Sequence, residues 1–530
     1  MPGTTRVVVV GNGMVGSRFV EDLMDRDRHE RFEVTVIGAE EYEPYNRVLL
    51  SELVSGKVDV AALALGEAVT PRTTIRRGVV AQAVDREAQV VLASDGSRHA
   101  YDLLVLATGS SARIPPIAGL SPLPRGVLPL RTLDDAREIV AATLNAHRAV
   151  VVGGGVLGLE AATGLARRGL CVTVVHGAPH LMERQLDPVA AQVASDGLDR
   201  LGIAQRLGVF TQEALVDDGR IVAVRLADGD LLPADLVVLT AGTVPEAGLA
   251  RTAGLEVQRG VVVGEDLATP ADPRVFAIGD CAQPPEGGTG LIAQGWDQAR
   301  RLAMLLASRP LEQHGRAITA DDAEDVAEPE VPHAGGTDVV RVKAHGLDVL
   351  TMGVCGPGRP GNGSQRVLQL SDPAQGRHLE IVVESGRLVG ATCVGAGSVG
   401  ADLTAAYTRA TPVPSDPAHL LLRPIPGTAT PASSPTHMPD RTTVCSCNGV
   451  TKKRIVTCWR DGADTVADVA RATKATTGCG GCKDVVGGLL EWLASTDPDR
   501  RNTQQPQADA STDSSEPSEA GASPRVGAVA

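Results

Sequence analysis

Residues 6–16 read RVVVVGNGMVG, and this stretch decides how the rest of the chain is interpreted. Four consecutive valines are typical of a parallel strand that is buried on both faces. Gly11, Gly13 and Gly16 then form G-x-G-x-x-G at the start of a helix expected over 14–24. In such a turn the first glycine allows the sharp bend, the second lets the backbone approach a pyrophosphate, and the third lets helix and strand pack closely. The helix N-terminus then presents free N–H groups to the phosphates.

An acidic residue completes this first unit. The next expected strand, 32–37, is followed by Glu40, which lies 24 residues beyond Gly16. A carboxylate about 20 residues past the fingerprint binds ribose hydroxyls in dinucleotide-binding folds. With a strand before the glycines and a helix after them, the pattern predicts a dinucleotide site.

Composition limits the class of protein. The chain has 530 residues, more than one core accommodates, so several domains are expected. Its formal net charge of −14 argues against nucleic acid and anionic membrane surfaces as partners. No apolar run reaches the ~20 residues of a membrane helix, and the N-terminus enters a strand without the organisation of a signal peptide. Together with the late clustering of cysteines, these features indicate a cytoplasmic protein.

Two further stretches are expected near the same nucleotide. Arg47 stands at a loop-to-helix entry, and it is either a surface arginine or one that reaches a cofactor phosphate or a flavin edge. The buried strand within 101–109 ends at Thr108 and Gly109, where small residues let the backbone approach a nucleotide.

The nucleotide-binding pattern occurs a second time. Residues 148–158 read RAVVVGGGVLG, in which Gly153, Gly155 and Gly158 repeat the first fingerprint, and a strand expected over 170–175 follows. Two such units in one chain suggest two dinucleotides, with electrons passing between them.

The acid expected after the second unit is missing, because His176 and Gly177 stand at that place. A neutral or cationic residue removes the partner of a free ribose 2′-hydroxyl and tolerates a 2′-phosphate, which favours NADPH slightly over NADH. The alternative is that His176 only packs at the strand end.

Two later strands end in small or acidic residues. The strand within 236–242 ends at Gly242, and another runs into Gly279 and Asp280. A carboxylate at the tip of a parallel sheet lies where open α/β sheets bind ligands, so Asp280 is expected to accept hydrogen bonds from ribityl or ribose hydroxyls. The alternative is a helix-capping aspartate.

Four cysteines gather in one late segment. Cys445 and Cys447 form a C-x-C pair, which 31 residues separate from the C-x₂-C pair of Cys479 and Cys482. Two close thiolate pairs converge on one tetrahedral or binuclear site, so the spacing predicts metal ligation. Zinc usually takes C-x₂-C pairs, whereas the tighter C-x-C pair among glycines and small polar residues favours a [2Fe–2S] cluster. Cys458 is expected to be a buried thiol on a helix.

These motifs together resemble a known family. GNGMVG, PYNRVLLSE, VVGGGVLGLEAA and FAIGDCA resemble the N-terminal half of the large subunit of NAD(P)H-dependent nitrite reductase and the electron-transfer subunit of assimilatory nitrate reductase. CSCNGVT with TGCGGC resembles the bacterioferritin-associated-ferredoxin-like [2Fe–2S] module of those proteins. The resemblance covers residues 6–495 and points to the pyridine nucleotide-disulfide oxidoreductase superfamily.

The resemblance implies an α/β fold of two interleaved Rossmann-like domains, with FAD in the first and NAD(P)H in the second. It also implies a small α/β C-terminal domain like that of rubredoxin reductases, and a small helical [2Fe–2S] domain. Glu160 matches the glutamate that lies near the flavin–nicotinamide contact in such flavoproteins. The expected divisions are 1–122 and 249–312 (FAD domain), 123–248 (NAD(P) domain), 313–336 (linker), 337–422 (C-terminal domain), 423–442 (linker), 443–496 ([2Fe–2S] domain) and 497–530 (disordered tail).

The implied function is electron transfer from NAD(P)H through FAD and the cluster to a separate nitrate or nitrite reductase. The nitrite reductase large subunit continues into a sirohaem and [4Fe–4S] half, which is not found here, so nitrite reduction by this chain itself is not expected. Segments 14–24 and 42–57 contain no cysteine, which disfavours disulfide reduction. The alternatives are an NAD(P)H:rubredoxin or ferredoxin reductase, and a flavoprotein whose cysteines bind zinc in a docking module. Homodimer formation is left open.

Overall fold

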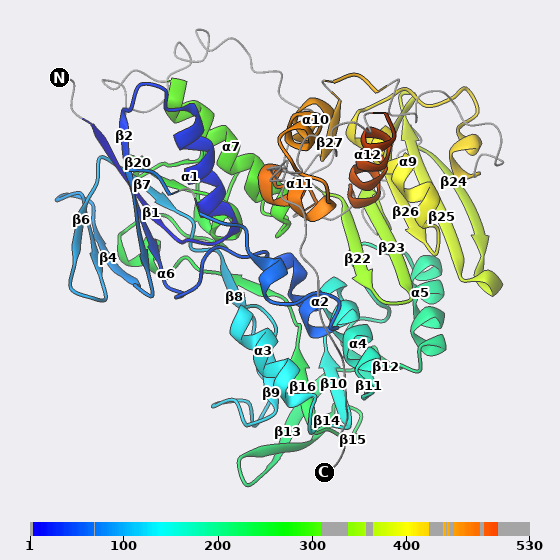
Figure 1. Ribbon diagram of the computed structural model, residues 1–530. Coiled ribbons are helices and arrows are strands. Elements are labelled where there is room, and N and C mark those ends of the chain that lie inside the picture. Colours follow the sequence, from blue (N-terminus) through cyan, green and yellow to red (C-terminus); the bar gives the residue numbers. More distant parts are fainter. Residues whose placement is uncertain are drawn as a thin grey trace, which may run out of the picture.

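The computed structural model describes residues 4–67, 69–308, 338–356, 364–422, 438–440, 442–445, 450–476 and 482–496. The main parts of the described chain are two Rossmann-type sheets, a five-stranded antiparallel sheet and a small helical domain, and smaller sheets are attached to the first two (Figure 1). The predicted α/β fold class is therefore confirmed.

The first sheet has the strand order β19-β20-β7-β1-β2-β3. Its members are β1 (Thr5–Val10), β2 (Phe32–Gly38), β3 (Thr73–Arg77), β7 (Leu103–Leu106), β19 (Ala268–Thr269) and β20 (Asp272–Ala277). β1 pairs in parallel with both β2 and β7, and the valines 7–10 are at most 5% exposed, as expected for a strand covered on both faces. Helices α1 (Met14–Arg26) and α7 (Ile292–Ser308) pack against each other, and the Trp296 indole donates to the Met14 carbonyl oxygen at 3.2 Å.

Smaller elements complete this unit. An antiparallel sheet has the order β4-β5-β6. The elements concerned are β4 (Ala81–Asp85), β5 (Val90–Ala93), β6 (Arg98–Ala100), the helix α2 (Leu50–Val54) and the 3₁₀ turns η1 (Arg47–Leu49), η2 (Ala61–Leu63) and η3 (Gly279–Cys281).

The second sheet is entirely parallel, in the order β12-β11-β10-β16-β9. Its strands are β9 (Val127–Pro129), β10 (Arg148–Val152), β11 (Cys171–His176), β12 (Ala204–Leu207) and β16 (Leu236–Leu239). The helices of this unit are α3 (Leu133–Ala142), α4 (Val156–Arg167) and α5 (Pro188–Arg200), and an antiparallel meander contains β13 (Thr211–Asp217), β14 (Arg220–Leu226) and β15 (Leu231–Pro233).

The two units are interleaved, because the whole second sheet lies in the chain between β7 and β20 of the first. The chain leaves and re-enters the first unit through an antiparallel ribbon of β8 (Ser110–Ala112) and β17 (Thr243–Pro245). The short elements that follow are α6 (Gly248–Thr252), β18 (Val261–Val262) and β21 (Ala282–Gln283). The boundaries predicted after residues 122 and 248 follow the two strands of this ribbon in the chain and stay predictions.

Each Rossmann sheet begins with the same ionic clamp. In the first unit, Asp102 accepts from the backbone N–H of Arg6 at 2.7 Å and from its guanidinium at 2.8 Å. In the second unit, Asp235 accepts from the backbone N–H and the guanidinium of Arg148 at 2.9 and 3.0 Å. The hydrogen bonds from arginine hold the pKa of Asp102 below its usual range and lower that of Asp235 to about 2.

The third sheet is antiparallel, in the order β22-β23-β26-β25-β24. It consists of β22 (Val340–Ala344), β23 (Leu347–Gly353), β24 (Arg366–Asp372), β25 (Arg377–Glu384) and β26 (Arg387–Val394), with η6 (Pro373–Gln375), α9 (Gly397–Thr408) and η7 (Pro417–Leu421). The segment expected to form a small α/β domain is thus an antiparallel sheet with the helix α9 from the same segment. The sheet also contacts α4 and α5 of the second unit.

The last domain is small and mostly helical. Its elements are β27 (Thr443–Cys445), β28 (Val450–Thr451), α10 (Lys452–Arg460), α11 (Val466–Thr473) and α12 (Lys483–Thr496). Ile455, Val469 and Val486 are fully buried in its core. Lys474, just past α11, donates a hydrogen bond to the Leu65 carbonyl oxygen, so this domain contacts the first unit (Figure 1).

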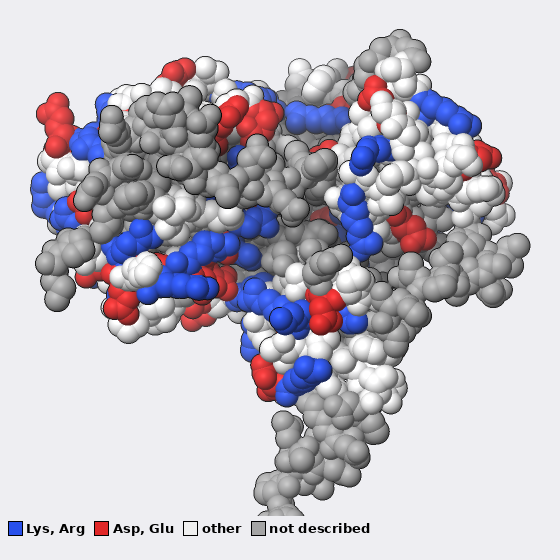
Figure 2. Space-filling model, turned by 90° about the horizontal axis from the view of Figure 1, so that it is seen from above, with Lys and Arg blue, Asp and Glu red and all other residues white. Residues whose placement is uncertain are grey.

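Two predicted linkers and the tail remain outside this description. Segments 313–336 and 497–530 lie wholly outside the described residues, and so does most of 423–442. In the described part of the chain, no helix is both long and apolar enough to cross a bilayer. On the face shown in Figure 2, acidic and basic side chains of the described residues lie intermixed and do not form one continuous basic surface.

Candidate functional site

A cavity of about 960 Å³ lies at the carboxyl ends of the first sheet's strands. The loop after β1, the end of β2, the end of β7 and η3 all contribute to its wall. This is the edge at which open α/β sheets bind ligands, and the volume is at the upper end of the range for cofactor pockets. Residues of the second unit and of β22 close the cavity from the other side.

The first glycine fingerprint is shaped for phosphates. Gly11 has φ +117°, and a Cβ at this position would lie 2.1 Å from the Ala107 carbonyl oxygen. A Cβ on Gly16 would lie 2.0 Å from the Gly11 carbonyl oxygen, so helix and strand meet through bare backbone. At Gly13, the N-cap of α1, a Cβ would meet nothing within 4 Å, and no side chain caps the helix there. The open N-terminus of α1 in the cavity wall therefore fits a pyrophosphate.

Glu40 and Arg47 meet in the cavity wall. The Arg47 guanidinium is ion-paired with Glu40 and lies 4.6 Å from the Tyr45 ring centroid. The Tyr45 hydroxyl donates to Glu40 at 2.7 Å and accepts from the Leu133 N–H at 2.9 Å, and burial raises the pKa of this phenol. Arg47 is a cavity residue rather than an isolated surface arginine, and Glu40 is fixed by two donors where a ribose hydroxyl is expected.

The carboxylate of Glu67, which is paired with an arginine, also supports the fingerprint loop. Glu67 accepts from the Asn12 side-chain amide at 3.0 Å and is ion-paired with Arg77. Burial acts to raise the pKa of Glu67, but the hydrogen bonds from Arg77 and Asn12 outweigh it and lower the pKa. Asn12 lies between the two glycines of the turn, so this network holds the loop in place.

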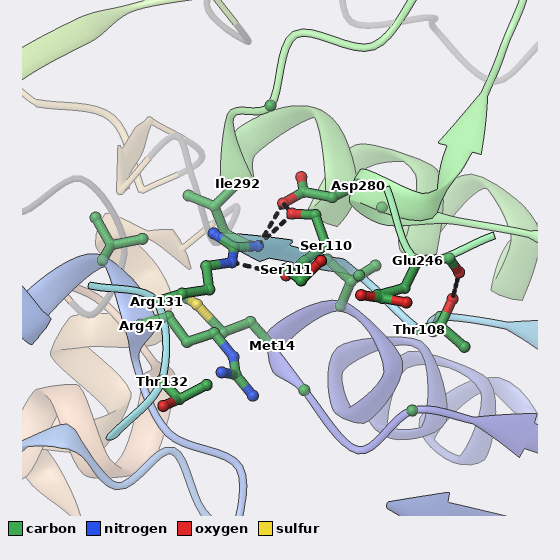
Figure 3. Close-up of a pocket in the computed structure, with 18 of the residues that line it drawn as sticks. Met14, Arg47, Thr108, Ser110, Ser111, Arg131, Thr132, Glu246, Asp280 and Ile292 are labelled. Carbon is green, nitrogen blue, oxygen red and sulfur yellow. Dashed lines mark hydrogen bonds and ion pairs between the residues drawn. The ribbon is translucent and has the colours of Figure 1, made fainter. Parts of the chain in front are cut away.

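Asp280 lies at the tip of the first sheet and faces Arg131 (Figure 3). The Arg131 guanidinium donates to the Asp280 carboxylate at 2.7 Å, and the Ser110 hydroxyl donates to the same carboxylate at 2.8 Å. These contacts make Asp280 part of a polar wall; it is not an isolated helix cap. Nearby, the Thr108 hydroxyl donates to the Glu246 carbonyl oxygen at 2.5 Å, and Gly109 and Gly279 also line the cavity.

Glu160 enters the same cavity from α4 of the second unit. Its side chain is buried, with one carboxylate oxygen accepting from the Ser51 hydroxyl at 2.5 Å and the other from the Lys343 backbone N–H at 2.8 Å. The carboxylate of this second-unit residue is thus held by one residue of the first unit and one strand residue of the third sheet. Its predicted place beside a flavin–nicotinamide contact remains a prediction.

The second glycine fingerprint repeats the geometry of the first. Gly153 has φ +122°, a Cβ on Gly158 would lie 1.9 Å from the Gly153 carbonyl oxygen, and a Cβ on Gly155 would meet nothing within 4 Å. The remaining predicted residue of this unit, Gly242, lies at the chain crossing, where its carbonyl oxygen accepts from the Arg113 N–H at 3.0 Å. These four glycines, His176 and Gly16 of the first fingerprint are not part of the 960 Å³ cavity wall. The other predicted nucleotide residues, Gly11, Gly13, Glu40, Arg47, Thr108, Gly109, Gly279 and Asp280, line it.

Two of the four predicted metal ligands can be located. Cys445 ends β27, Cys482 precedes α12, and both are buried in the core of the last domain. Cys447 and Cys479 lie outside the described residues. Cys458 is buried on α10, as predicted.

Disulfide chemistry finds no support in the cavity. None of the described residues that line it is a cysteine. The nearest in sequence, Cys281, is fully buried with its sulfur 3.4 Å from the Leu106 carbonyl oxygen, and burial raises the pKa of this thiol. A thiol held neutral and away from the cavity is a poor nucleophile.

The sequence reasoning missed four residues of the site. Arg131, Ser110 and Lys343 line the cavity, and Ser51 on α2 binds the Glu160 carboxylate. Each meets its partner across a long stretch of chain, so no local pattern marks them. A local signal does exist beside Arg131, because residues 132–135 form a capping box that starts α3.

Comparison with known proteins follows the same division of the chain. Residues 5–301 match the family model described as pyridine nucleotide-disulphide oxidoreductase. The chain belongs to this family. Residues 443–492 match a model described as a BFD-like [2Fe-2S] binding domain. The resemblance predicted from the motifs is confirmed for both parts.

Relatives and solved structures agree with the family. The chain is 31% identical to nitrite reductase [NAD(P)H] of Bacillus subtilis, over 94% of this chain and 59% of the relative. It is 29% identical to the assimilatory nitrate reductase electron transfer subunit of the same organism, over 93% of this chain and 60% of the relative. It therefore spans about three fifths of the length of these relatives. A covalent putidaredoxin reductase–putidaredoxin complex matches with a TM-score of 0.66 and 26% identity, over 79% of this chain and 96% of that chain.

Membership in the pyridine nucleotide-disulphide oxidoreductase family identifies this chain as an NAD(P)H-dependent oxidoreductase with FAD and NAD(P)H as cofactors. The second match identifies a [2Fe–2S] cluster in the last domain and weighs against the zinc alternative. The residues present fit these groups: an uncapped helix end and open glycine for phosphates, fixed carboxylates for hydroxyls, and buried cysteines for the cluster.

Proposed function

We propose that this chain passes electrons from NAD(P)H, by way of FAD and a [2Fe–2S] cluster, to a separate nitrate or nitrite reductase. The observation that carries the proposal is that one cavity is lined by both nucleotide-binding units, with Gly13 from the first and Glu160 from the second. A shared wall brings two dinucleotides together at one place. When bound, FAD accepts a hydride from nicotinamide and gives up electrons singly, which matches a two-electron donor to a one-electron cluster.

The chain's own residues hold and orient the cofactor in this proposal. The fingerprint glycines and the α1 N-terminus bind the pyrophosphate, and Glu40 binds the adenosine ribose. Asp280, with its charge balanced by Arg131, accepts from hydroxyls at the other end of the cavity. Glu160 keeps both oxygens engaged by Ser51 and Lys343, so its carboxylate has one fixed orientation in the wall.

The proposed cluster ligands are Cys445, Cys447, Cys479 and Cys482. Thiolate ligation of iron is favoured in a reducing compartment, so we place the protein in the cytoplasm. Formation of a homodimer remains a prediction.

The names of the relatives support the proposed acceptor, since one is an electron transfer subunit of an assimilatory nitrate reductase. The competing function is a ferredoxin or rubredoxin reductase. It has support from the putidaredoxin reductase fold match, in which the reductase is in complex with a separate protein, putidaredoxin. The cluster domain fused to this chain favours the first function, because the one-electron carrier is already present.

Anaerobic titration of the purified full chain with NADH and NADPH, followed by absorbance, tests the proposal. We expect bleaching of a flavin band and of a cluster band, together with iron and acid-labile sulfide in the protein. Ferricyanide is expected to be reduced, and nitrate is not reduced by this chain alone. A colourless preparation after anaerobic reconstitution would refute the proposal, and zinc in place of iron would support the docking-module alternative.

The cluster's part is tested by a pair of variants in the same domain. Cys482→Ser is expected to remove the cluster and abolish electron delivery to a nitrate or nitrite reductase, while ferricyanide reduction continues. Cys458→Ala is the matched control, because this buried thiol is not among the proposed ligands. Unimpaired delivery by Cys482→Ser would contradict the relay. Delivery to a rubredoxin but to neither reductase would favour the competing function.

A further inference from the structure

The end of β11 carries a carboxylate that is not adjacent to it in the sequence. His176 is the last residue of β11, and its Nδ1 accepts a hydrogen bond from the Gly154 N–H at 3.1 Å. Because an amide N–H only donates, the proton of the neutral imidazole lies on Nε2. This Nε2 is 3.0 Å from Glu183 Oε2, to which it donates. The position where the sequence showed no acid therefore has one, supplied from seven residues further on.

The loop that presents Glu183 is held in one conformation. Met182 is fully buried with φ +49°, an uncommon value for a non-glycine residue, and its N–H donates to the Gly154 carbonyl oxygen at 3.0 Å. A Cβ on Gly154 would lie 2.9 Å from the His176 ring. The loop, the histidine and the second fingerprint are thus packed as one piece, while the Glu183 side chain stays 39% exposed.

An exposed aromatic ring rests against the backbone just past the end of β11. Phe210 is 68% exposed, and a Cβ on Gly177 would lie 2.2 Å from its ring, so the ring rests on the backbone just past β11. The Val209 N–H donates to the His176 carbonyl oxygen at 3.2 Å, which fixes the loop to the strand end. A large apolar side chain left open beside a nucleotide-binding fingerprint offers a stacking surface for a flat ring.

The cation on the neighbouring strand is already neutralised. Arg206 on β12 pairs with Asp228 at 2.7 Å and also with Asp230. It is therefore not a ready partner for an added phosphate.

We propose that Glu183 and Phe210 form the adenosine subsite of the second unit, and that this subsite selects NADH over NADPH. The inference rests on the proposed function, in which the second unit binds the pyridine nucleotide. A carboxylate here accepts hydrogen bonds from free ribose hydroxyls and repels a 2′-phosphate. The preference that His176 alone indicated from the sequence is thereby reversed.

Binding of nucleotide fragments tests the subsite without any electron transfer. Calorimetric titration of the FAD-loaded full chain compares ADP-ribose with its 2′-phosphorylated form. We expect ADP-ribose to bind at least about tenfold more tightly, and Glu183→Gln to reduce this ratio about tenfold. Phe210→Leu is expected to weaken both ligands equally. Glu138→Gln, an exposed glutamate on α3 of the same unit, is the control and leaves the ratio unchanged.

Stopped-flow reduction of the flavin by NADH and NADPH distinguishes a wrong subsite assignment from a wrong proposed function. We expect Glu183→Gln to change the apparent Kd values and not the limiting rate. If NADH reduces the flavin but the NADH/NADPH ratio is the same in Glu183→Gln, the subsite assignment is wrong. If NADPH is preferred and Arg184→Gln abolishes that preference, the neighbouring exposed arginine reads a 2′-phosphate and the proposal is overturned. If neither nucleotide reduces the flavin or binds, the proposed function itself fails, and the subsite with it.

Discussion

The two nucleotide-binding units share a backbone and differ in the side chains at the strand end. Gly11 and Gly153 have φ of +117° and +122°, and a Cβ on Gly16 or Gly158 would lie 2.0 or 1.9 Å from a carbonyl oxygen. After the second strand, however, the first unit has an acid paired with arginine, and the second has a histidine that holds a distant glutamate. The close approach of helix and strand is required by the fold, and both units achieve it with the same glycine geometry. The side chains expected to contact the nucleotide differ between the units because each unit is expected to bind a different nucleotide.

The largest effect is expected when a methyl group is added where the helix and the strand of either unit touch. Gly16→Ala and Gly158→Ala each force a carbonyl oxygen to move, so each is expected to destabilise its unit by about 3 kcal/mol. Chemical denaturation of the two variants measures the loss. Gly488→Ala is the control, because this exposed glycine of α12 has nothing within 4 Å of a Cβ. A loss at one position and none at the other would break the equivalence.

A smaller effect, on ligand binding, is expected to show that the first unit binds FAD and the second binds NAD(P)H. A Cβ on Gly13 or Gly155 meets no protein atom within 4 Å, so alanine there leaves the fold intact and occupies space meant for phosphates. We expect Gly13→Ala to weaken FAD retention by about 2 kcal/mol, or about thirtyfold. Gly155→Ala is expected to retain FAD and to raise the KM for NAD(P)H by a similar factor. FAD content after gel filtration and steady-state ferricyanide reduction measure the two effects. The reverse pattern would exchange the assignments of the units.

The smallest effect concerns the ionic clamp at the start of each sheet. The hydrogen bond from Arg148 lowers the pKa of Asp235 from its usual 3.8 to about 2. A lowered pKa stabilises the fold above pH 3.8, and this contribution is lost as the pH falls toward 2. Asp235→Asn is therefore expected to cost about 1 kcal/mol at pH 7, after allowance for solvent screening, and nothing near pH 2. Asp102→Asn should behave in the same direction, which denaturation at several pH values would show.

The sequence predicted well those features that depend on residues close together in the chain. The glycine spacing, the buried valine strand and the acid at Glu40 all depend on neighbours within about thirty residues. The strand and the helix form over the residues expected for them, and the ligand roles of the glycines and Glu40 stay predictions. The interleaving of the two units came from the family resemblance, because the pairing of β7 with β20 joins segments that are distant in the chain.

What the sequence could not show depends on side chains that meet across units. Arg131 reaches Asp280, which is 149 residues away, and Ser51 reaches Glu160, which is 109 residues away. Glu183 was missed because the expected position for the acid is the strand end, and a buried left-handed Met182 is needed to bring the later residue back to it. Such contacts form only in the tertiary structure.

The interleaved topology also sets an order of assembly. During translation every strand of the second sheet has been synthesised by residue 239, whereas the first sheet also needs β20, which ends at Ala277. The first sheet, whose N-terminal strands are synthesised first, is thus completed after the second sheet. Those strands must avoid aggregation while the whole second unit is synthesised.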